Sequence, residues 1–223
     1  MRSLLRRLLL SRSPGRRPPL PSGPLRLHVG AGRARLEGWV NLDRQDLPEV
    51  DVVADATRGL GFTDVEAVYA EHFLEHLRVD HAVDFLVECH RCLAPDGLLR
   101  LSTPNLDWVW LTHYHPAAPA EVKRREAILS NRAFQGWRHR FLWNRELLGA
   151  ALEACGFADL TWCRWGESEH EVFRGIERHE TYVDAPELPH VLVVEAARGA
   201  ARPRELAELR ETFDRELLQH LED

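Results

Sequence analysis

A short apolar strand that runs straight into a glycine turn constrains the fold of this chain most. Residues 25–29 read Leu-Arg-Leu-His-Val, and Gly30-Ala31-Gly32 follows at once. A second apolar stretch, residues 39–42, ends in Asp43. Glycines let the backbone approach a ligand closely, and an acidic side chain after the next strand can accept hydrogen bonds from hydroxyl groups. The pattern is typical of an open α/β sheet that binds a nucleoside at the carboxyl ends of its strands.

Strand and helix signals alternate along most of the chain. Seven strands are expected, near residues 25–29, 40–43, 52–54, 67–70, 98–102, 160–165 and 190–197. Asp80 is a suitable N-cap for an amphipathic helix that ends before Gly97, and Asn144 is a suitable N-cap for another that Gly156 closes. This alternation predicts an α/β fold with a mainly parallel sheet.

The composition fits a single globular domain with an acidic body. The 223 residues are 44% hydrophobic and 29% charged, which is ordinary for one α/β domain. No apolar run approaches the ~18 to 20 residues that span a bilayer. Residues 1–26 hold seven arginines and no acidic residue, so the rest of the chain has 22 basic and 35 acidic side chains, a balance of −13. An acidic body repels phosphate, which argues against nucleic acid as the main substrate.

The chain divides into a core domain with three additions. Residues 1–24, rich in arginine and proline, are expected to form a disordered basic tail. Its arginines could make weak contact with an anionic membrane surface, or contact a nucleic acid or the acidic body of the chain. Residues 25–199 form the core domain, and within it residues 104–143, rich in aromatic side chains, are expected to form a lid over a substrate. Residues 200–223 have apolar side chains at helical spacing. We expect this amphipathic helix to pack on the body or on a second subunit, which would give a homo-oligomer.

Further polar residues follow the third and fourth expected strands. Asp55-Ala56 comes after the third strand, and Glu71-His72 comes after the fourth. With these residues and the glycine turn, the sequence resembles the class I S-adenosylmethionine (SAM) dependent methyltransferases, particularly their small type 11 group. The resemblance implies a Rossmann-like α/β fold with a seven-stranded, mostly parallel sheet, helices on both faces, and a last strand that runs antiparallel. It also implies SAM as the cofactor.

The resemblance implies a role for each of these residues. The expected cofactor-binding residues are Gly30, Ala31, Gly32, Asp43, Asp55, Ala56, Glu71 and His72. The glycine turn would lie against the methionine and ribose portions of SAM, and Asp43 would bind the ribose hydroxyls. Asp55, with the Ala56 backbone, would read the adenine amino group, and Glu71 and His72 would lie at the methionine end. Structural alternatives remain open for the glycines and the two aspartates: a simple turn for the glycines, a solvated loop residue for Asp43, and an N-cap or turn residue for Asp55.

The sequence departs from the family pattern near the glycine turn. The resemblance covers residues 25–103 and 144–197, but the usual acidic residue two positions before the first glycine is His28, and the usual third glycine is Ala34. Residues 33–38 leave room for one helical turn at most before the second strand. A shortened first helix predicts a cofactor pocket that is more open on that side.

Two motifs formally suggest metal or redox chemistry, but their positions in the chain favour a structural role. His72-Phe-Leu-Glu75-His76 formally matches the zinc motif H-x-x-E-H, which needs a helix and a third ligand from elsewhere. Because His72 directly follows a buried strand, we expect no metal site here. Cys89 and Cys92 form a C-x-x-C pair near the end of a helix, where packed and reduced thiols are expected. Reduced cysteines favour the cytoplasm as the location.

The expected reaction is methyl transfer to a small-molecule or sugar acceptor. In-line displacement from a sulfonium needs a close, dry approach of the acceptor, and a base only if the acceptor must lose a proton. His139 is the candidate base, ahead of the pair His113 and His115. Arg138 and Arg140 could bind an anionic acceptor.

Two other functions remain open at this point. One is a catalytically degenerate SAM-binding module that scaffolds partners through its C-terminal helix. The other is a nicotinamide-dependent oxidoreductase, which is disfavoured because Arg35 occupies the third glycine position of G-x-G-x-x-G. Binding of SAM or of NADH would separate these alternatives.

Overall fold

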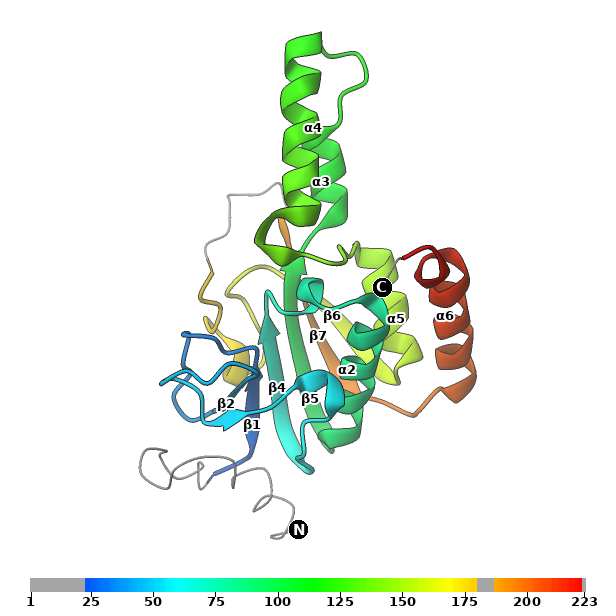
Figure 1. Cartoon of the computed structure of the whole chain (residues 1–223). Helices are drawn as coiled ribbons and strands as arrows, with labels where there is room; N and C mark the ends of the chain where they lie inside the picture. Colours follow the sequence, from blue (N-terminus) through cyan, green and yellow to red (C-terminus); the bar gives the residue numbers. More distant parts are fainter. Residues whose placement is uncertain (1–22, 180–186, 222–223) are drawn as a thin grey trace.

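The computed structural model describes residues 23–179 and 187–221 (Figure 1). The basic tail expected over residues 1–24 lies outside the described residues, apart from its last two. In the described part of the chain, no helix is both long enough and apolar enough to cross a membrane.

One seven-stranded sheet forms the centre of the molecule. Its strands are β1 (Arg26–Val29), β2 (Val40–Asp43), β3 (Val52–Val53), β4 (Val65–Glu71), β5 (Leu93–Pro104), β6 (Phe157–Cys163) and β7 (Val191–Arg198). The strand order is β3-β2-β1-β4-β5-β7-β6, and β7 runs antiparallel to both of its neighbours while the remaining pairs are parallel. This arrangement confirms the expected mostly parallel Rossmann-like sheet. The order in which the chain adds strands reverses at β1, because β2 and β3 lie on one side of it and β4 and β5 on the other. A cleft is therefore expected above the carboxyl ends of β1 and β4.

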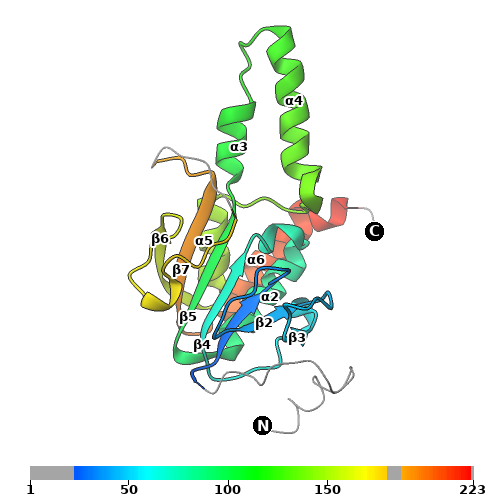
Figure 2. The same cartoon turned by 90° about the vertical axis from the view of Figure 1, so that its left-hand side faces the viewer.

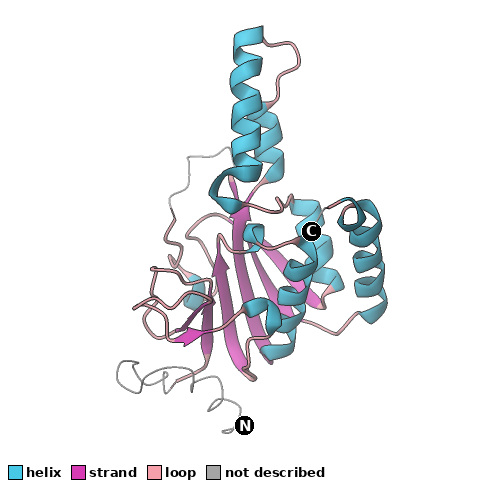
Figure 3. Cartoon of the chain, viewed as in Figure 1, coloured by secondary structure: helices cyan, strands magenta, loops and turns pink. Residues whose placement is uncertain are grey.

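Three α-helices cover one face of the sheet: α2 (Val79–Cys92), α5 (Arg145–Ala154) and α6 (Pro203–Glu216) (Figure 3). Their apolar sides and the facing strand residues form the larger core cluster. The α5 N-cap is Asn144 as expected, since its side chain accepts a hydrogen bond from the Leu147 N–H at 3.0 Å. Helix α2 begins two residues earlier than expected, with Arg78 at the N-cap and Asp80 in the first turn.

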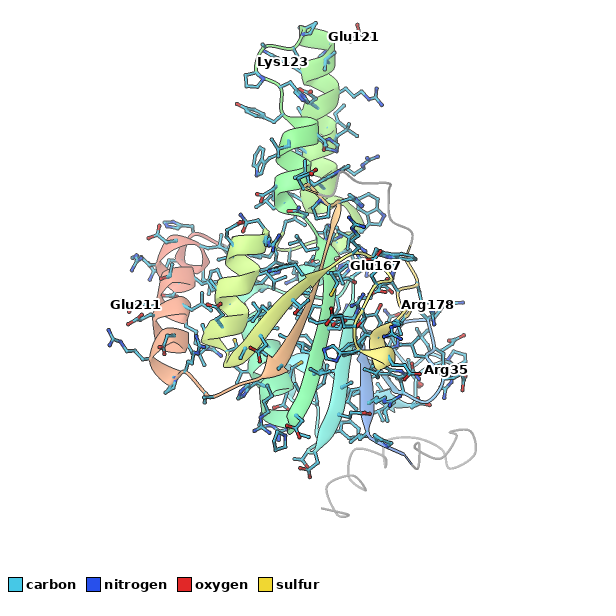
Figure 4. All side chains as sticks on the ribbon, turned by 180° about the vertical axis from the view of Figure 1, so that it is seen from behind. Arg35, Glu121, Lys123, Glu167, Arg178 and Glu211 are labelled. Carbon is cyan, nitrogen blue, oxygen red and sulfur yellow. The ribbon has the colours of Figure 1, made fainter. Side chains whose placement is uncertain are left out.

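The opposite face carries no α-helix among the described residues. Residues 164–179, with the short 3₁₀ helix η5 (Glu171–Phe173), lie across it, and Figure 4 shows this side with Glu167 and Arg178 labelled. A smaller core cluster beneath includes Trp39, Tyr69 and Phe173. The expectation of helices on both faces therefore fails in this detail. The reason is that the connections β1–β2, β2–β3 and β3–β4 are too short to hold a crossover helix.

A buried arginine fastens residues 164–179 to the sheet. Arg100, in the middle of β5, donates from Nε to Glu177 Oε1 at 2.6 Å and also donates to Glu195 of β7. All three side chains are at most 4% exposed. Burial acts to lower the pKa of Arg100, but its hydrogen bond with Glu177 and the two carboxylate charges raise it overall. The guanidinium therefore stays charged and binds two elements together.

The insert expected over residues 104–143 is a helical hairpin. It comprises α3 (Leu106–His113), α4 (Ala120–Gln135) and the 3₁₀ turn η4 (Gly136–Arg138). It starts at the carboxyl end of β5 and projects away from the body (Figures 1 and 2). The two helices contact each other through Trp110 and Phe134, whose ring centroids are 6.3 Å apart. The hairpin thus stands at the edge of the sheet where a ligand is expected.

Helix α6 packs on the body of the same chain, which was one of the two arrangements expected. Phe213 is 7% exposed, and its ring lies 6.0 Å from that of Phe141 and 6.3 Å from that of Trp143. Arg210 of α6 pairs with Asp84 of α2 at 2.7 Å. The apolar side of α6 is therefore covered by the chain's own core rather than left for a second subunit.

Candidate active site

Two adjoining cavities lie above the carboxyl ends of the parallel strands. The first, called the strand-end cavity, has a volume of about 560 Å³ and lies over β1, β2 and β3. The second, called the hairpin cavity, has a volume of about 480 Å³ and lies between β4, β5 and the α3–α4 hairpin. Both are lined by His72, His76 and Trp137. The site therefore has two compartments that meet at these three side chains.

The glycine turn shapes the floor of the strand-end cavity. Gly30 has φ +72°, and a Cβ there would lie 2.5 Å from the ring of Phe73, so only glycine fits. Gly32 has φ +51°, and its N–H donates to Asp43 Oδ2 at 2.9 Å. Gly30 lines the cavity, while Ala31 and Gly32 are not among the described lining residues. Ala31 and Gly32 instead tie the turn to β2, through hydrogen bonds from their N–H groups to Leu42 and Asp43.

Asp43 is held in a fixed position at the end of β2 and lines the strand-end cavity. Its Oδ2 accepts the Gly32 N–H, and its Oδ1 accepts the Gln45 N–H at 2.7 Å. A carboxylate has about four lone-pair sites, so two backbone hydrogen bonds leave it able to accept more. Asp43 can therefore accept hydrogen bonds from two neighbouring hydroxyl groups without moving.

Asp55 combines a structural contact with a place in the same cavity. Its Oδ1 accepts the Thr57 N–H at 3.1 Å and the Thr57 hydroxyl at 2.7 Å, which caps the short 3₁₀ helix η2 (Ala56–Arg58). The hydrogen bond from the Thr57 side chain lowers the pKa of Asp55. Asp55 and Ala56 both line the strand-end cavity. Asp55 is thus the N-cap of η2 through Oδ1, while its Oδ2 lies 3.5 Å from Arg58 Nε.

Glu71 is turned away from the two cavities. Its carboxylate accepts the backbone N–H groups of Arg178 and His179 at 2.9 to 3.0 Å, and its Oε2 lies 3.2 Å from His179 Nδ1. Burial acts to raise the pKa of Glu71, but these hydrogen bonds lower it overall, and the same contact raises the pKa of His179. Glu71 is not among the described residues that line either cavity, whereas the adjacent His72 lines both cavities. The structure therefore uses Glu71 to hold residues 178 and 179 against β4.

Six histidines line the hairpin cavity: His72, His76, His113, His139, His179 and His190. The other lining side chains are mostly apolar, including Trp108, Leu129 and Leu142, with Arg132 as a cation. Arg138 and Arg140, which sequence reasoning assigned to an acceptor, line the strand-end cavity instead.

The backbone just before His139 is strained. Trp137 and Arg138 have φ +53° and +67°, a region that side-chain-bearing residues rarely adopt. Immediately afterwards, the Arg140 N–H donates to the Glu75 carbonyl oxygen at 2.7 Å. This tight turn brings His139 against His76, with ring centroids 5.2 Å apart.

The surroundings of His139 favour a neutral ring that can accept a proton. Its Nδ1 is 2.9 Å from the Ala133 carbonyl oxygen, so Nδ1 carries the hydrogen and Nε2 carries the lone pair. Burial lowers the pKa of His139, so the ring is neutral near pH 7. A neutral imidazole with a defined tautomer is the form that a general base needs.

The chain is similar to known methyltransferases in part of its sequence and in its fold. A family model described as a methyltransferase domain matches residues 35–101. The fold is similar to that of a SAM dependent methyltransferase from Archaeoglobus fulgidus, at 17% identity and a TM-score of 0.51, covering 80% of this chain and 87% of that one. Residues 35–101 are thus similar to a methyltransferase domain, and the fold of the chain is that of a SAM-dependent methyltransferase.

A second similar structure is that of a possible exported protein from Bordetella parapertussis. Its identity to this chain is 12% and its TM-score is 0.50, with 81% of this chain and 64% of that chain covered. No curated protein sequence matches the chain significantly. At these identities the structural likeness concerns the fold alone, so the roles of individual residues depend on the geometry of the site.

Sequence reasoning missed several of the residues that line the two cavities. The family match at residues 35–101 includes Asp43, Asp55 and His72, all of which lie near strand ends. His179 and His190 come from parts of the chain far from those strands, and no local pattern marks them. The sequence signal that could have indicated His76 was the formal zinc motif, which was set aside.

Proposed function

We propose that this chain transfers a methyl group from SAM to a small-molecule or sugar acceptor. The supporting observation is the pair of cavities that meet at His72, His76 and Trp137. Both volumes are in the range of about 300 to 1,000 Å³ that is usual for small-ligand sites. A cofactor in the strand-end cavity would direct its reactive end toward an acceptor in the hairpin cavity.

The residues of the strand-end cavity fit a nucleoside cofactor. The backbone at Gly30 leaves room that a Cβ would fill, and Asp43 has the lone pairs to bind both ribose hydroxyls. Asp55 and Ala56 lie where an adenine ring would extend, and His72 marks the methionine end. SAM, when bound, supplies a methyl group on a positively charged sulfur.

The hairpin cavity fits an acceptor with an apolar or ring-shaped face and a negative group. Trp108 and Leu129 offer the apolar surface, and Arg132 offers a charge. If the acceptor is a hydroxyl or an ammonium, its proton would pass to Nε2 of His139. The acidic balance of the chain beyond residue 26 supports an acceptor other than nucleic acid. The four free cysteines support the cytoplasm as the location.

Titration calorimetry with SAM and S-adenosylhomocysteine tests the cofactor assignment. We expect wild type to bind both, and Asp43→Ala to weaken SAM binding by roughly 10- to 100-fold, since a hydrogen bond to a charged group contributes about 1.5–3 kcal/mol. Glu37→Ala is the control, because Glu37 is an exposed acidic residue near the same turn. Absence of SAM binding by wild type would refute the proposal.

A turnover assay separates the proposal from the two alternatives. We expect release of S-adenosylhomocysteine with at least one member of a panel of small hydroxyl, amine and sugar acceptors. SAM binding with no release across the panel would favour the degenerate scaffold. Binding of NADH in place of SAM would favour the oxidoreductase.

A further inference from the structure

We propose that Glu75, His76 and His139 form a binding site for a divalent transition-metal ion, best suited to Zn²⁺, where the two cavities meet. One potential ligand atom from each of these side chains lies within 4.8 Å of the other two. All three line the hairpin cavity, and His76 also lines the strand-end cavity. The three come from two segments, since His139 is far from Glu75 and His76 in sequence.

Hydrogen bonds at Nδ1 leave Nε2 of both histidines available to a metal ion. His139 Nδ1 donates to the Ala133 carbonyl oxygen at 2.9 Å, and His76 Nδ1 faces the Arg138 carbonyl oxygen at 3.4 Å. A hydrogen on Nδ1 leaves the lone pair on Nε2, and neither Nε2 has a protein partner among the described residues. Metal-binding histidines almost always donate their other ring nitrogen to a carbonyl or carboxylate oxygen in this way.

Glu75 is a fully buried carboxyl group with one side-chain partner at each oxygen. Its side chain is 0% exposed. Its Oε1 lies 2.9 Å from His72 Nδ1, and its Oε2 accepts the Thr103 hydroxyl at 3.1 Å. Buried carboxylates are costly unless they are paired or bind a metal. Each oxygen keeps a second lone pair, so Glu75 can bind an ion while His72 and Thr103 orient it.

The backbone fixes the three side chains relative to one another. The Arg140 and Phe141 N–H groups both donate to the Glu75 carbonyl oxygen, at 2.7 and 3.2 Å. This ties the segment that carries His139 to the 3₁₀ turn η3 (Leu74–His76) that carries the other two residues. The strained turn at Trp137 and Arg138 persists because these contacts hold it.

Two nitrogen ligands and one oxygen ligand favour zinc in an open, reactive type of site. Zinc sites of this type have three protein ligands and a fourth position for water or substrate. With bonds of about 2.0–2.1 Å, tetrahedral zinc separates its ligands by about 3.4 Å. The ligand atoms here, within 4.8 Å of one another, would have to move together on binding. The site differs from the formal H-x-x-E-H motif, because His72 orients Glu75 instead of acting as the second histidine ligand.

The consequence for methyl transfer rests on the proposed function. An acceptor hydroxyl in the hairpin cavity could occupy the fourth position, where the ion lowers the pKa of that hydroxyl. The proton would leave to water, the methyl group would pass from sulfur to the acceptor oxygen, and S-adenosylhomocysteine would depart. His139 would then hold the ion rather than accept the proton.

Cobalt titration of the full chain, prepared without a histidine tag and stripped with a chelator, tests the site. We expect one Co²⁺ per chain with visible absorption bands of low-symmetry, four- or five-coordinate cobalt, displaced by Zn²⁺. Glu75→Gln, His76→Ala and His139→Ala should each weaken binding at least tenfold, since even the loss of an outer contact costs about 10- to 100-fold. His113→Ala is the matched control, because His113 lines the same cavity outside the trio.

Each outcome has a defined meaning. Absence of saturable binding, or equal weakening by His113→Ala, overturns the metal site. If Glu75→Gln fails to fold, His76→Ala decides, since His76 is partly exposed. SAM titration with and without the chelator separates the two proposals: SAM binding without metal binding overturns only the metal site, and metal binding without SAM binding overturns only the proposed function.

Discussion

Three residues with side chains adopt left-handed backbone conformations around the meeting point of the two cavities. His72, Trp137 and Arg138 have φ between +46° and +67°. Each such residue costs on the order of 1–3 kcal/mol and persists where its surroundings hold it, most often at functional sites. The His72 N–H is held by the Ser102 carbonyl oxygen at 2.9 Å, at the end of β5. The strain is therefore concentrated where the two cavities meet.

Arg100→Leu should destabilise the fold strongly. The change removes the guanidinium that lies between two buried carboxylates, Glu177 and Glu195, and breaking a buried pair in this way costs about 3–5 kcal/mol. Urea unfolding at pH 7 measures the loss. Arg204→Leu is the control, since Arg204 is exposed and should give no measurable change. A loss as small as that of the control would show that residues 164–179 do not depend on Arg100.

The sequence predicted the position of a site residue when that position depends only on where a strand ends. Asp43 and Asp55 each follow a strand and reach the strand-end cavity. Glu71 also ends a strand, but its carboxylate is taken by the backbone of residues 178 and 179, which no local pattern relates to β4. The contribution of His179 to the hairpin cavity was hidden for the same reason.

At the scale of helices and strands, the sequence predicted where a helix forms better than what that helix packs against. The apolar spacing of residues 200–223 predicted a helix, but it could not tell whether the partner was the body or another subunit. Phe213 packs on Phe141 and Trp143, which precede α5 by sequence and have no pattern linking them to α6. The absence of α-helices from the second face was predictable only for the β1–β2 connection, where residues 33–38 leave room for one helical turn at most.

Phe213→Ala should lower the free energy of unfolding by about 3 kcal/mol, because a buried aromatic ring is lost and a cavity remains. Urea unfolding measures the change, and gel filtration with light scattering reports the oligomeric state in parallel. Leu221→Ala, at a side chain that is 46% exposed, should change stability by less than about 0.5 kcal/mol. Unaltered stability of Phe213→Ala with a shift in oligomeric state would instead assign α6 to a subunit interface.

At the scale of the whole molecule, one sheet edge carries both compartments. The parallel strands end beneath the strand-end cavity, and the hairpin stands over the second cavity, with Glu121 and Lys123 at its far end (Figure 4). Binding of the cofactor and binding of the acceptor should therefore respond to different substitutions. The lid assignment of residues 104–143 leads to the same expectation.

Leu129→Trp tests this separation, because Leu129 of α4 lines the hairpin cavity but not the strand-end cavity among the described lining residues. The larger ring should fill acceptor space, so we expect SAM affinity within about twofold of wild type and at least a tenfold loss of turnover with an acceptor found in the panel. Calorimetry and release of S-adenosylhomocysteine measure the two quantities. Ile128→Trp is the matched control, since Ile128 is the preceding residue and is 70% exposed. Equal effects of the two substitutions, or a parallel loss of SAM affinity, would show that the hairpin does not enclose a separate acceptor compartment.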